Sequence, residues 1–171
     1  MTIAGGVQRW LPFICAVAII LLDALTKILT VTHLAPIKWF LWYPYGGIGL
    51  FENFFGIQFS LVYATNNGAA WSLFSSFPYS LVAFRIVLIA ALFLYTIRDN
   101  KNPRWNIPLA FILAGAIANV IDFFLYGQVI DMLYFVFWGY SYPVFNIADS
   151  AIFIGVIWLC FIQLFSGKGN S

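Results

Sequence analysis

Four long apolar runs are the feature that most constrains how this chain can fold. They cover about residues 11–32, 79–97, 107–125 and 147–165. A helix needs about 20 consecutive, mainly apolar residues to cross the hydrocarbon core of a bilayer. Only 8% of the residues are charged, whereas a soluble domain carries roughly 25%. The sequence therefore predicts an all-α integral membrane protein, a single domain over residues 1–171 with four transmembrane helices.

The basic residues predict how these spans are oriented. Five of the eight flank the start of the first span, join the second span to the third, or follow the fourth: Arg9, Arg98, Lys101, Arg104 and Lys168. Cytoplasmic loops of membrane proteins carry such an excess of Lys and Arg. Both termini are therefore predicted to be cytoplasmic, with segments 33–78 and 126–146 on the outer side. A basic patch that would suit nucleic acid is not evident.

The two outer segments differ in pattern. "GIGLFENF" (47–54) and "IQFSLVYA" (57–64) alternate apolar and polar or small residues, and are expected to form strands of a small extracytoplasmic sheet. "TNNGAAWSLF" (65–74) is compatible with a tight turn or with a re-entrant loop. Segment 126–146 is too aromatic and too interrupted for a span. It is predicted to be an interfacial segment, partly helical, along the outer membrane surface.

Two charges interrupt the first span. Asp23 and Lys27 are four residues apart and thus share one helix face, where they can neutralise each other. A structural ion pair facing the bundle interior is favoured over a direct part in chemistry or transport. In the second span, Arg85 lies near the outer end, where its long side chain can reach the headgroups.

Polar residues gather at the predicted outer ends of the spans. Three of the six acidic residues lie there without nearby basic residues, and three asparagines lie at the same level: Asp122, Asp131, Asp149, Asn66, Asn119 and Asn146. Two carboxyl groups that face each other in a poorly hydrated place share a proton, because ionising both is too costly. Such a pair can activate water for peptide hydrolysis.

Other chemistries have little support in the sequence. The single histidine, His33, is interpreted as structural, and Cys15 and Cys160 fall inside spans. The sequence offers no nucleophile elbow and no metal-ligand spacing, so neither a metal nor a cofactor is expected. Two function classes remain from the residues alone: a membrane-embedded aspartate hydrolase, and a proton-coupled transporter that uses the same acids as a relay. A binding or scaffold protein is the third alternative.

Four motifs, in order along nearly the whole chain, resemble those of lipoprotein signal peptidase, the type II signal peptidase of bacteria. They are "DALTK" from Asp23, "NNGAAWSL" from Asn66, "AGAIANVIDFFLYGQVIDML" from Ala114, and "FNIADSAI" from Phe145. The resemblance implies a multi-pass enzyme of the bacterial inner membrane with its active site near the outer leaflet. Its substrate would be a diacylglyceryl-modified prolipoprotein held in membrane lipid, and a monomer is expected.

The resemblance also assigns roles to residues. The catalytic aspartates fall on Asp131 and Asp149. Five residues match positions that line the site and bind substrate: Asn66, Gly68, Asn119, Asp122 and Asn146. Asp23 and Lys27 match positions that support the fold.

Phe123 departs from the family pattern, because an arginine usually follows the aspartate that matches Asp122. A cationic contact near the site is then missing, and a catalytically altered, lipoprotein-binding homologue is a further alternative. Ala114 and Ala118 replace family glycines in the same motif.

Overall fold

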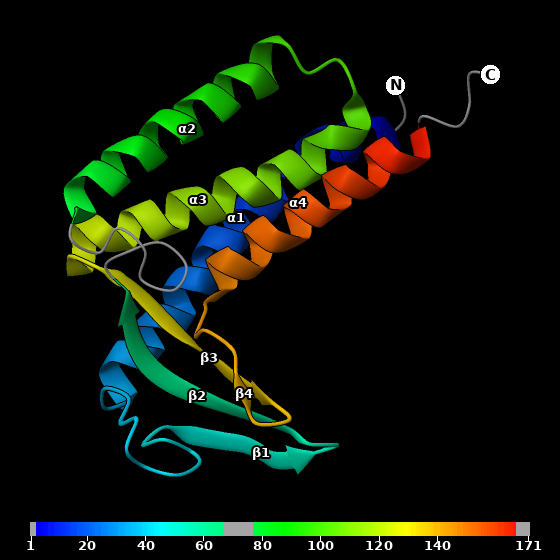
Figure 1. Cartoon of the computed structure of the whole chain (residues 1–171). Coiled ribbons are helices and arrows are strands. Elements are labelled where there is room, and N and C mark those ends of the chain that lie inside the picture. The colour runs from blue at the N-terminus through cyan, green and yellow to red at the C-terminus, as the bar shows by residue number, and fades with distance from the viewer. Residues whose placement is uncertain (1–2, 67–76, 167–171) are drawn as a thin grey trace.

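The computed structural model describes residues 3–66 and 77–166 of the chain. Within these ranges, helices α1 (Ile3–His33), α2 (Pro78–Arg98), α3 (Asn106–Tyr126) and α4 (Ile147–Ser166) form one end of the molecule. A short 3-10 turn, Pro103–Trp105, leads into α3. Strands β1 (Ile48–Phe54), β2 (Ile57–Asn66), β3 (Val129–Phe137) and β4 (Tyr140–Ser141) form a sheet beyond the ends of α2, α3 and α4 and beside the C-terminal part of α1 (Figure 1).

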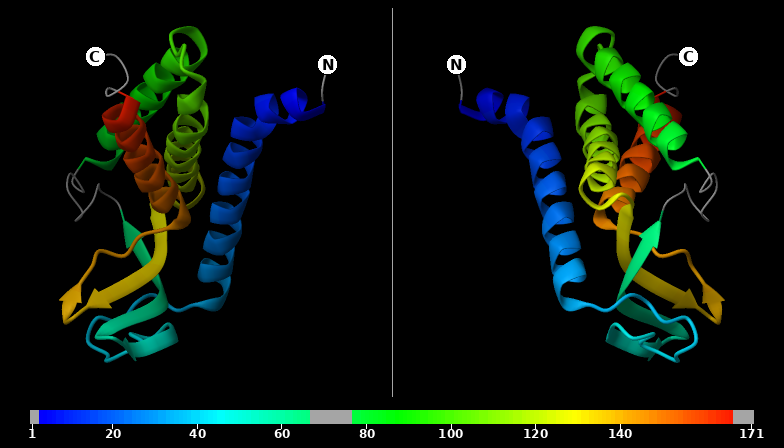
Figure 2. Two further views of the ribbon diagram at one scale, coloured as in Figure 1. Left: turned by 90° about the vertical axis from the view of Figure 1, so that its right-hand side faces the viewer. Right: turned by 90° about the vertical axis from the view of Figure 1, so that its left-hand side faces the viewer.

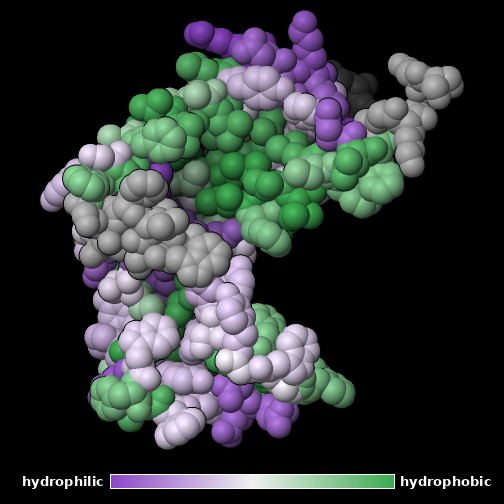
Figure 3. Space-filling model, viewed as in Figure 1, coloured by the Kyte–Doolittle hydropathy of each residue, from purple (hydrophilic) through white to green (hydrophobic). Residues whose placement is uncertain are grey.

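All four of these helices are long and apolar enough to cross a membrane. Among the described residues, the candidate spans are Trp10–His33, Pro78–Arg98, Pro103–Tyr126 and Ile147–Phe165. Large apolar side chains cover their outer surface, and Figure 3 shows this apolar belt over the helices, with polar residues at the end opposite the sheet. Apolar surface of this extent needs lipid or another chain to cover it. The prediction of four spanning helices is confirmed.

Helix α3 is the centre of the bundle. It packs against α1, α2 and α4, and Figure 2 shows α1 on one side of it and α2 on the other. Gly115 allows α4 to approach closely, since a Cβ atom there would lie 2.3 Å from the carbonyl oxygen of Ala148. This contact fixes the start of α4, where Asp149 lies, against the middle of α3.

The sheet is antiparallel, with strand order β1-β2-β3-β4. Residues 48–54 and 57–66 pair as neighbours, so the two predicted strands and their sheet are confirmed. Strand β2 pairs with β3 from Ile57↔Phe137 to Asn66↔Val129, with an irregularity between Leu61 and Ala64. Ala64 is the first paired residue of β2 after this irregularity, and its partner in β3 is Asp131.

The prediction of a partly helical segment over 126–146 is wrong. Nine of these residues, Val129–Phe137, form strand β3, and the two-residue strand β4 follows. The segment is rich in β-branched and aromatic residues, which favour a strand when a partner strand is present. Strand β2 supplies that partner, and the rings of Phe59 and Phe135 stack with centroids 4.2 Å apart across the pair.

Candidate active site

Asp131 and Asp149, here called the acid pair, come from different elements and line one cavity. Asp131 belongs to β3 and its side chain is buried, whereas Asp149 lies in the first turn of α4 and is half-buried. The cavity has a volume of about 410 Å³. Among the described residues, its other polar lining comes from Asn66, Arg85, Asn119 and Tyr142. Residues that are far apart in the sequence thus meet where the sheet joins the helices.

Asn146 connects the two acids. Its side-chain Nδ2 donates a hydrogen bond to Asp131 Oδ1 at 2.7 Å, and its Oδ1 accepts one from the backbone N–H of Asp149 at 2.8 Å. The second bond satisfies an N–H in the first turn of α4, as an N-cap side chain does. Asp149 Oδ2 in turn accepts the backbone N–H of Asn146 at 3.4 Å, which completes a capping box. The local sequence "NIAD" therefore positions Asp149 by ordinary helix-capping chemistry.

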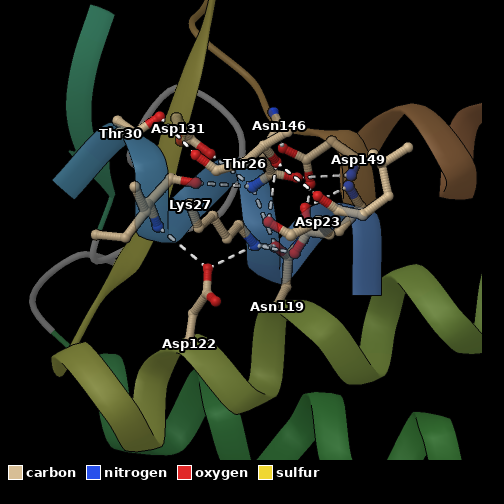
Figure 4. A network of polar contacts seen from close by, with 12 residues as sticks. Asp23, Thr26, Lys27, Thr30, Asn119, Asp122, Asp131, Asn146 and Asp149 are labelled. Atoms are coloured by element: carbon tan, nitrogen blue, oxygen red, sulfur yellow. Dashed lines mark hydrogen bonds and ion pairs between the residues drawn. The ribbon is translucent and has the colours of Figure 1, made fainter. Parts of the chain in front are cut away.

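Asn119 of α3 holds the other carboxylate oxygen of Asp149. Its Nδ2 donates to Asp149 Oδ1 at 2.8 Å. Its own Oδ1 accepts from Asn146 Nδ2 and from Lys27 Nζ, both at 3.1 Å. Because Nδ2 and Oδ1 are both engaged, the amide has one fixed orientation and presents its donor to Asp149 (Figure 4).

Lys27 lies behind the acid pair at the centre of a buried group of charges. Its Nζ is 2.5 Å from Asp23 Oδ2 and 2.6 Å from Asp122 Oδ2, so the ion pair between Asp23 and Lys27 is present. Lys27, Asp23, Asn119 and Asp122, here called the Lys27 network, are all buried. Charges removed from water in this way need close, hydrogen-bonded partners, and each of them has such partners here.

The two acids of the Lys27 network also fix the backbone beside the acid pair. Asp23 Oδ1 accepts the N–H of Ala148 at 2.8 Å, one residue before Asp149. Asp122 Oδ2 accepts the N–H of Ile130 at 3.2 Å, one residue before Asp131. A single cation thus anchors, through two carboxylates, the chain segments that carry both members of the acid pair.

Burial and charge make Asp131 a weak acid. Burial raises the pKa of its carboxyl from the ordinary 3.8 to about 8, and the negative charge of Asp149 acts in the same direction. Hydrogen bonds from Asn146 and Asn66, and the charge of Lys27, oppose this rise in the pKa. At neutral pH the carboxyl of Asp131 therefore carries a proton and can donate a hydrogen bond.

The remaining predicted site residues are placed differently. Asn66, at the end of β2, lines the cavity, whereas Asp122 lies with Lys27 and Ile130 behind it. Gly68 lies outside the described residues. Within the described ranges no three His, Cys, Asp or Glu side chains are grouped to hold a metal ion.

Two features of the site were not foreseen from the sequence. The ring of Phe123 packs edge-to-face against Tyr79 of α2, with centroids 5.6 Å apart. Arg85 of α2 lines the cavity of the acid pair, where the negative charge of Asp149 attracts it. The sequence predicts only that this side chain can reach the headgroups. Spacing along one helix does not reveal which polar groups of other elements the side chain faces.

Comparisons with known proteins agree with this architecture. The model of a family described as "Signal peptidase (SPase) II" matches residues 15–165. A lipoprotein signal peptidase of Chlorobium phaeobacteroides is 38% identical, over 85% of this chain and 93% of that protein. The lipoprotein signal peptidase of Burkholderia vietnamiensis is 36% identical, over 98% of this chain and 94% of that protein.

Solved structures are similar as well. A bacterial membrane enzyme determined by the in meso method at 2.3 Å resolution has a TM-score of 0.77 and 28% identity, and covers 94% of this chain and 91% of its own. A second such enzyme, at 1.9 Å resolution, has a TM-score of 0.72 and 29% identity, and covers 93% and 94%.

Proposed function

This chain belongs to the signal peptidase (SPase) II family, and we propose that it cleaves signal peptides from diacylglyceryl-modified prolipoproteins with Asp131 and Asp149 as the catalytic acids. The family membership confirms the resemblance seen in the four sequence motifs. The chain is a multi-pass bacterial membrane peptidase. The observation that carries the aspartyl mechanism is the shared cavity, which is lined by both acids and by the asparagines that hold them.

The two acids have different environments, and this difference supports different roles. The pKa of Asp131 is raised to about 8 by burial, so Asp131 holds a proton at neutral pH. Asp149 accepts N–H hydrogen bonds at the amino end of α4, where the helix dipole stabilises a negative charge. Asp149 is therefore the general base, and Asp131 is the general acid.

The reaction follows from these roles. The Asp149 carboxylate removes a proton from water, and the resulting hydroxide attacks the carbonyl carbon of the peptide bond before the lipid-modified cysteine. Asp131 gives its proton to the carbonyl oxygen, which forms a neutral gem-diol. Collapse of the gem-diol breaks the C–N bond, Asp149 gives its proton to the leaving nitrogen, and Asp131 recovers its proton from the gem-diol hydroxyl.

The placement in the membrane follows from charge. The connection between α2 and α3 lies at the end of the bundle opposite the sheet, on the same end as the start of α1 and the end of α4 (Figure 1), and its sequence contains Lys101 and Arg104 directly after Arg98. Because cytoplasmic loops are rich in Lys and Arg, both termini belong on the cytoplasmic side of the bacterial inner membrane. The sheet and the acid pair then face the outer leaflet, where a lipid-modified substrate lies.

The test uses the purified full-length chain in detergent with a diacylglyceryl-modified precursor. Wild type should release the signal peptide, and Asp131→Asn and Asp149→Asn should each reduce kcat by a factor of about 10³ or more while the protein stays folded. Glu52→Gln is the matched control, because Glu52 is an exposed acid on β1 away from the acid pair. Near-normal turnover by either site variant would reject the aspartyl mechanism. Proton-coupled flux in liposomes without any cleaved product would instead favour a transporter.

A further inference from the structure

Helix α2 brings one charged side chain to the acid-pair cavity. Among the described residues that line this cavity, Arg85 is the only cation. It lies seven residues inside α2 from Pro78, which is about 10 Å along the helix axis. An arginine at such a position in a membrane span is energetically costly, and arginines of this kind mark functional sites by default.

The wall of the cavity becomes apolar along α4, away from the acid pair. Beyond Asp149, α4 contributes Ile152, Phe153 and Val156, which lie one to two turns farther along the helix. Arg85 contributes to the same cavity from α2. The cavity thus continues from the reacting groups along an apolar helix face, with a guanidinium on the side of α2.

A ring contact near the Pro78 end of α2 holds this helix against α3. Tyr79, one turn and a half before Arg85, packs edge-to-face on Phe123 of α3 at 5.6 Å. The negative charge of Asp149 attracts Arg85. A guanidinium has five N–H donors in a rigid planar fork, so it can bind a further acceptor alongside its contacts within the protein.

The proposed substrate carries acceptors that suit this position. Its two ester carbonyl groups are several bonds from the scissile peptide bond and lie at the base of the two acyl chains. In a cavity without bulk water, an ester oxygen that loses its hydrogen bonds to solvent needs a donor from the protein. The apolar face of Ile152, Phe153 and Val156 suits the acyl chains that begin at these esters.

We propose that Arg85 is a substrate-binding residue that donates hydrogen bonds to the ester carbonyl oxygens of the diacylglyceryl group, where the acyl chains leave the cavity between α2 and α4. This inference rests on the proposed function. It assigns recognition of the lipid modification to a residue outside the acid pair, and it places the polar part of the lipid opposite the apolar face of α4.

The experiment compares two precursors that differ only in the lipid linkage. One carries ester-linked chains and the other carries ether-linked chains of the same length, which have no carbonyl oxygen. For wild type, the ether precursor should have a KM about tenfold higher with an unchanged kcat, because an interaction made equally in ground and transition states is lost. Arg85→Gln should abolish this tenfold preference, so that the two precursors have the same KM. Arg85→Lys should retain part of the ester preference.

Thermal unfolding in detergent shows whether Arg85→Gln is folded. Arg98→Gln, at the cytoplasmic end of the same helix, is the control and should keep the full ester preference. An equal loss on both precursors, or a wild type that does not distinguish them, would overturn the role of Arg85. Failure of wild type to cleave either precursor would instead overturn the proposed function.

Discussion

Asn146 donates a 2.7 Å hydrogen bond to Asp131 while its side-chain oxygen caps the helix that carries Asp149. One fully buried amide thus joins strand β3 of the sheet to the first turn of helix α4. This amide and the backbone anchors of the Lys27 network position the two acids relative to each other.

The two functions of Asn146 can be separated by substitution. Asn146→Ser keeps an N-cap acceptor but removes the donor to Asp131, so stability should stay near wild type while kcat falls by a factor of about 10². Asn146→Ala removes both and should also lower the free energy of unfolding by about 1–2 kcal/mol. Thermal unfolding in detergent and the cleavage assay measure the two effects. Equal activity of Asn146→Ser and wild type would show that the bond to Asp131 is dispensable.

The pH dependence of cleavage should reflect the proton on Asp131. Because the pKa of Asp131 is raised to about 8, the general acid is lost as the pH rises through this value. The profile of kcat/KM should therefore be bell-shaped, with its alkaline limb centred near pH 8. A profile that stays flat from pH 7 to pH 10, measured with the detergent-purified enzyme, would contradict the assignment.

The same shift predicts how stability depends on pH. Between the ordinary pKa of 3.8 and the folded pKa of about 8, the folded state binds more protons at Asp131 than the unfolded state does. The contribution of this carboxyl to stability is therefore present in full below pH 4 and is lost as the pH rises toward 8. Asp131→Asn should be less sensitive to this rise in pH than wild type. Identical slopes for the two proteins in thermal unfolding would contradict the burial argument.

Removal of the central cation should leave the two buried carboxylates of Asp23 and Asp122 without a cationic partner. Lys27→Met is expected to reduce the free energy of unfolding by about 3–5 kcal/mol, as breaking a buried charge group does. The triple variant Asp23→Asn, Lys27→Met, Asp122→Asn removes all three charges and should recover most of that loss. Chemical unfolding in mixed micelles compares the two. A triple variant that is no more stable than Lys27→Met would show that the charges themselves are not the cause.

Two glycines of the α3–α4 interface provide a matched pair. A Cβ atom at Gly115 would lie 2.3 Å from the Ala148 oxygen, and one at Gly155 would lie 2.7 Å from the Pro108 oxygen. Both Gly→Ala variants should be destabilised, by about 1–3 kcal/mol, because the helices must separate. Only Gly115→Ala displaces the start of α4, so its cleavage rate should fall far more. Equal activity losses in the two variants would mean that the effect is one of general stability.

Much of the architecture was predictable because it depends on local sequence. Long apolar runs determine the four spans, since a bilayer requires about 20 apolar residues per helix. The alternating residues of 47–54 and 57–64 indicated two strands that do pair. Segment 126–146 was assigned incorrectly because its aromatic composition suits either a membrane interface or a strand. The presence of β2 as a partner, which is a non-local fact, decides between them.

The sequence by itself determined which polar residues lie near the ends of the spans, because the long apolar runs fix where each span begins and ends. Only the tertiary structure decided which of them meet. Lys27 reaches Asp122 as well as Asp23, Asn146 lies between β3 and α4, and Arg85 turns toward the acids. Spacing along one helix reports only which residues share its face. The packing of α3 against three other helices, together with the register of β3, determines the partners across elements.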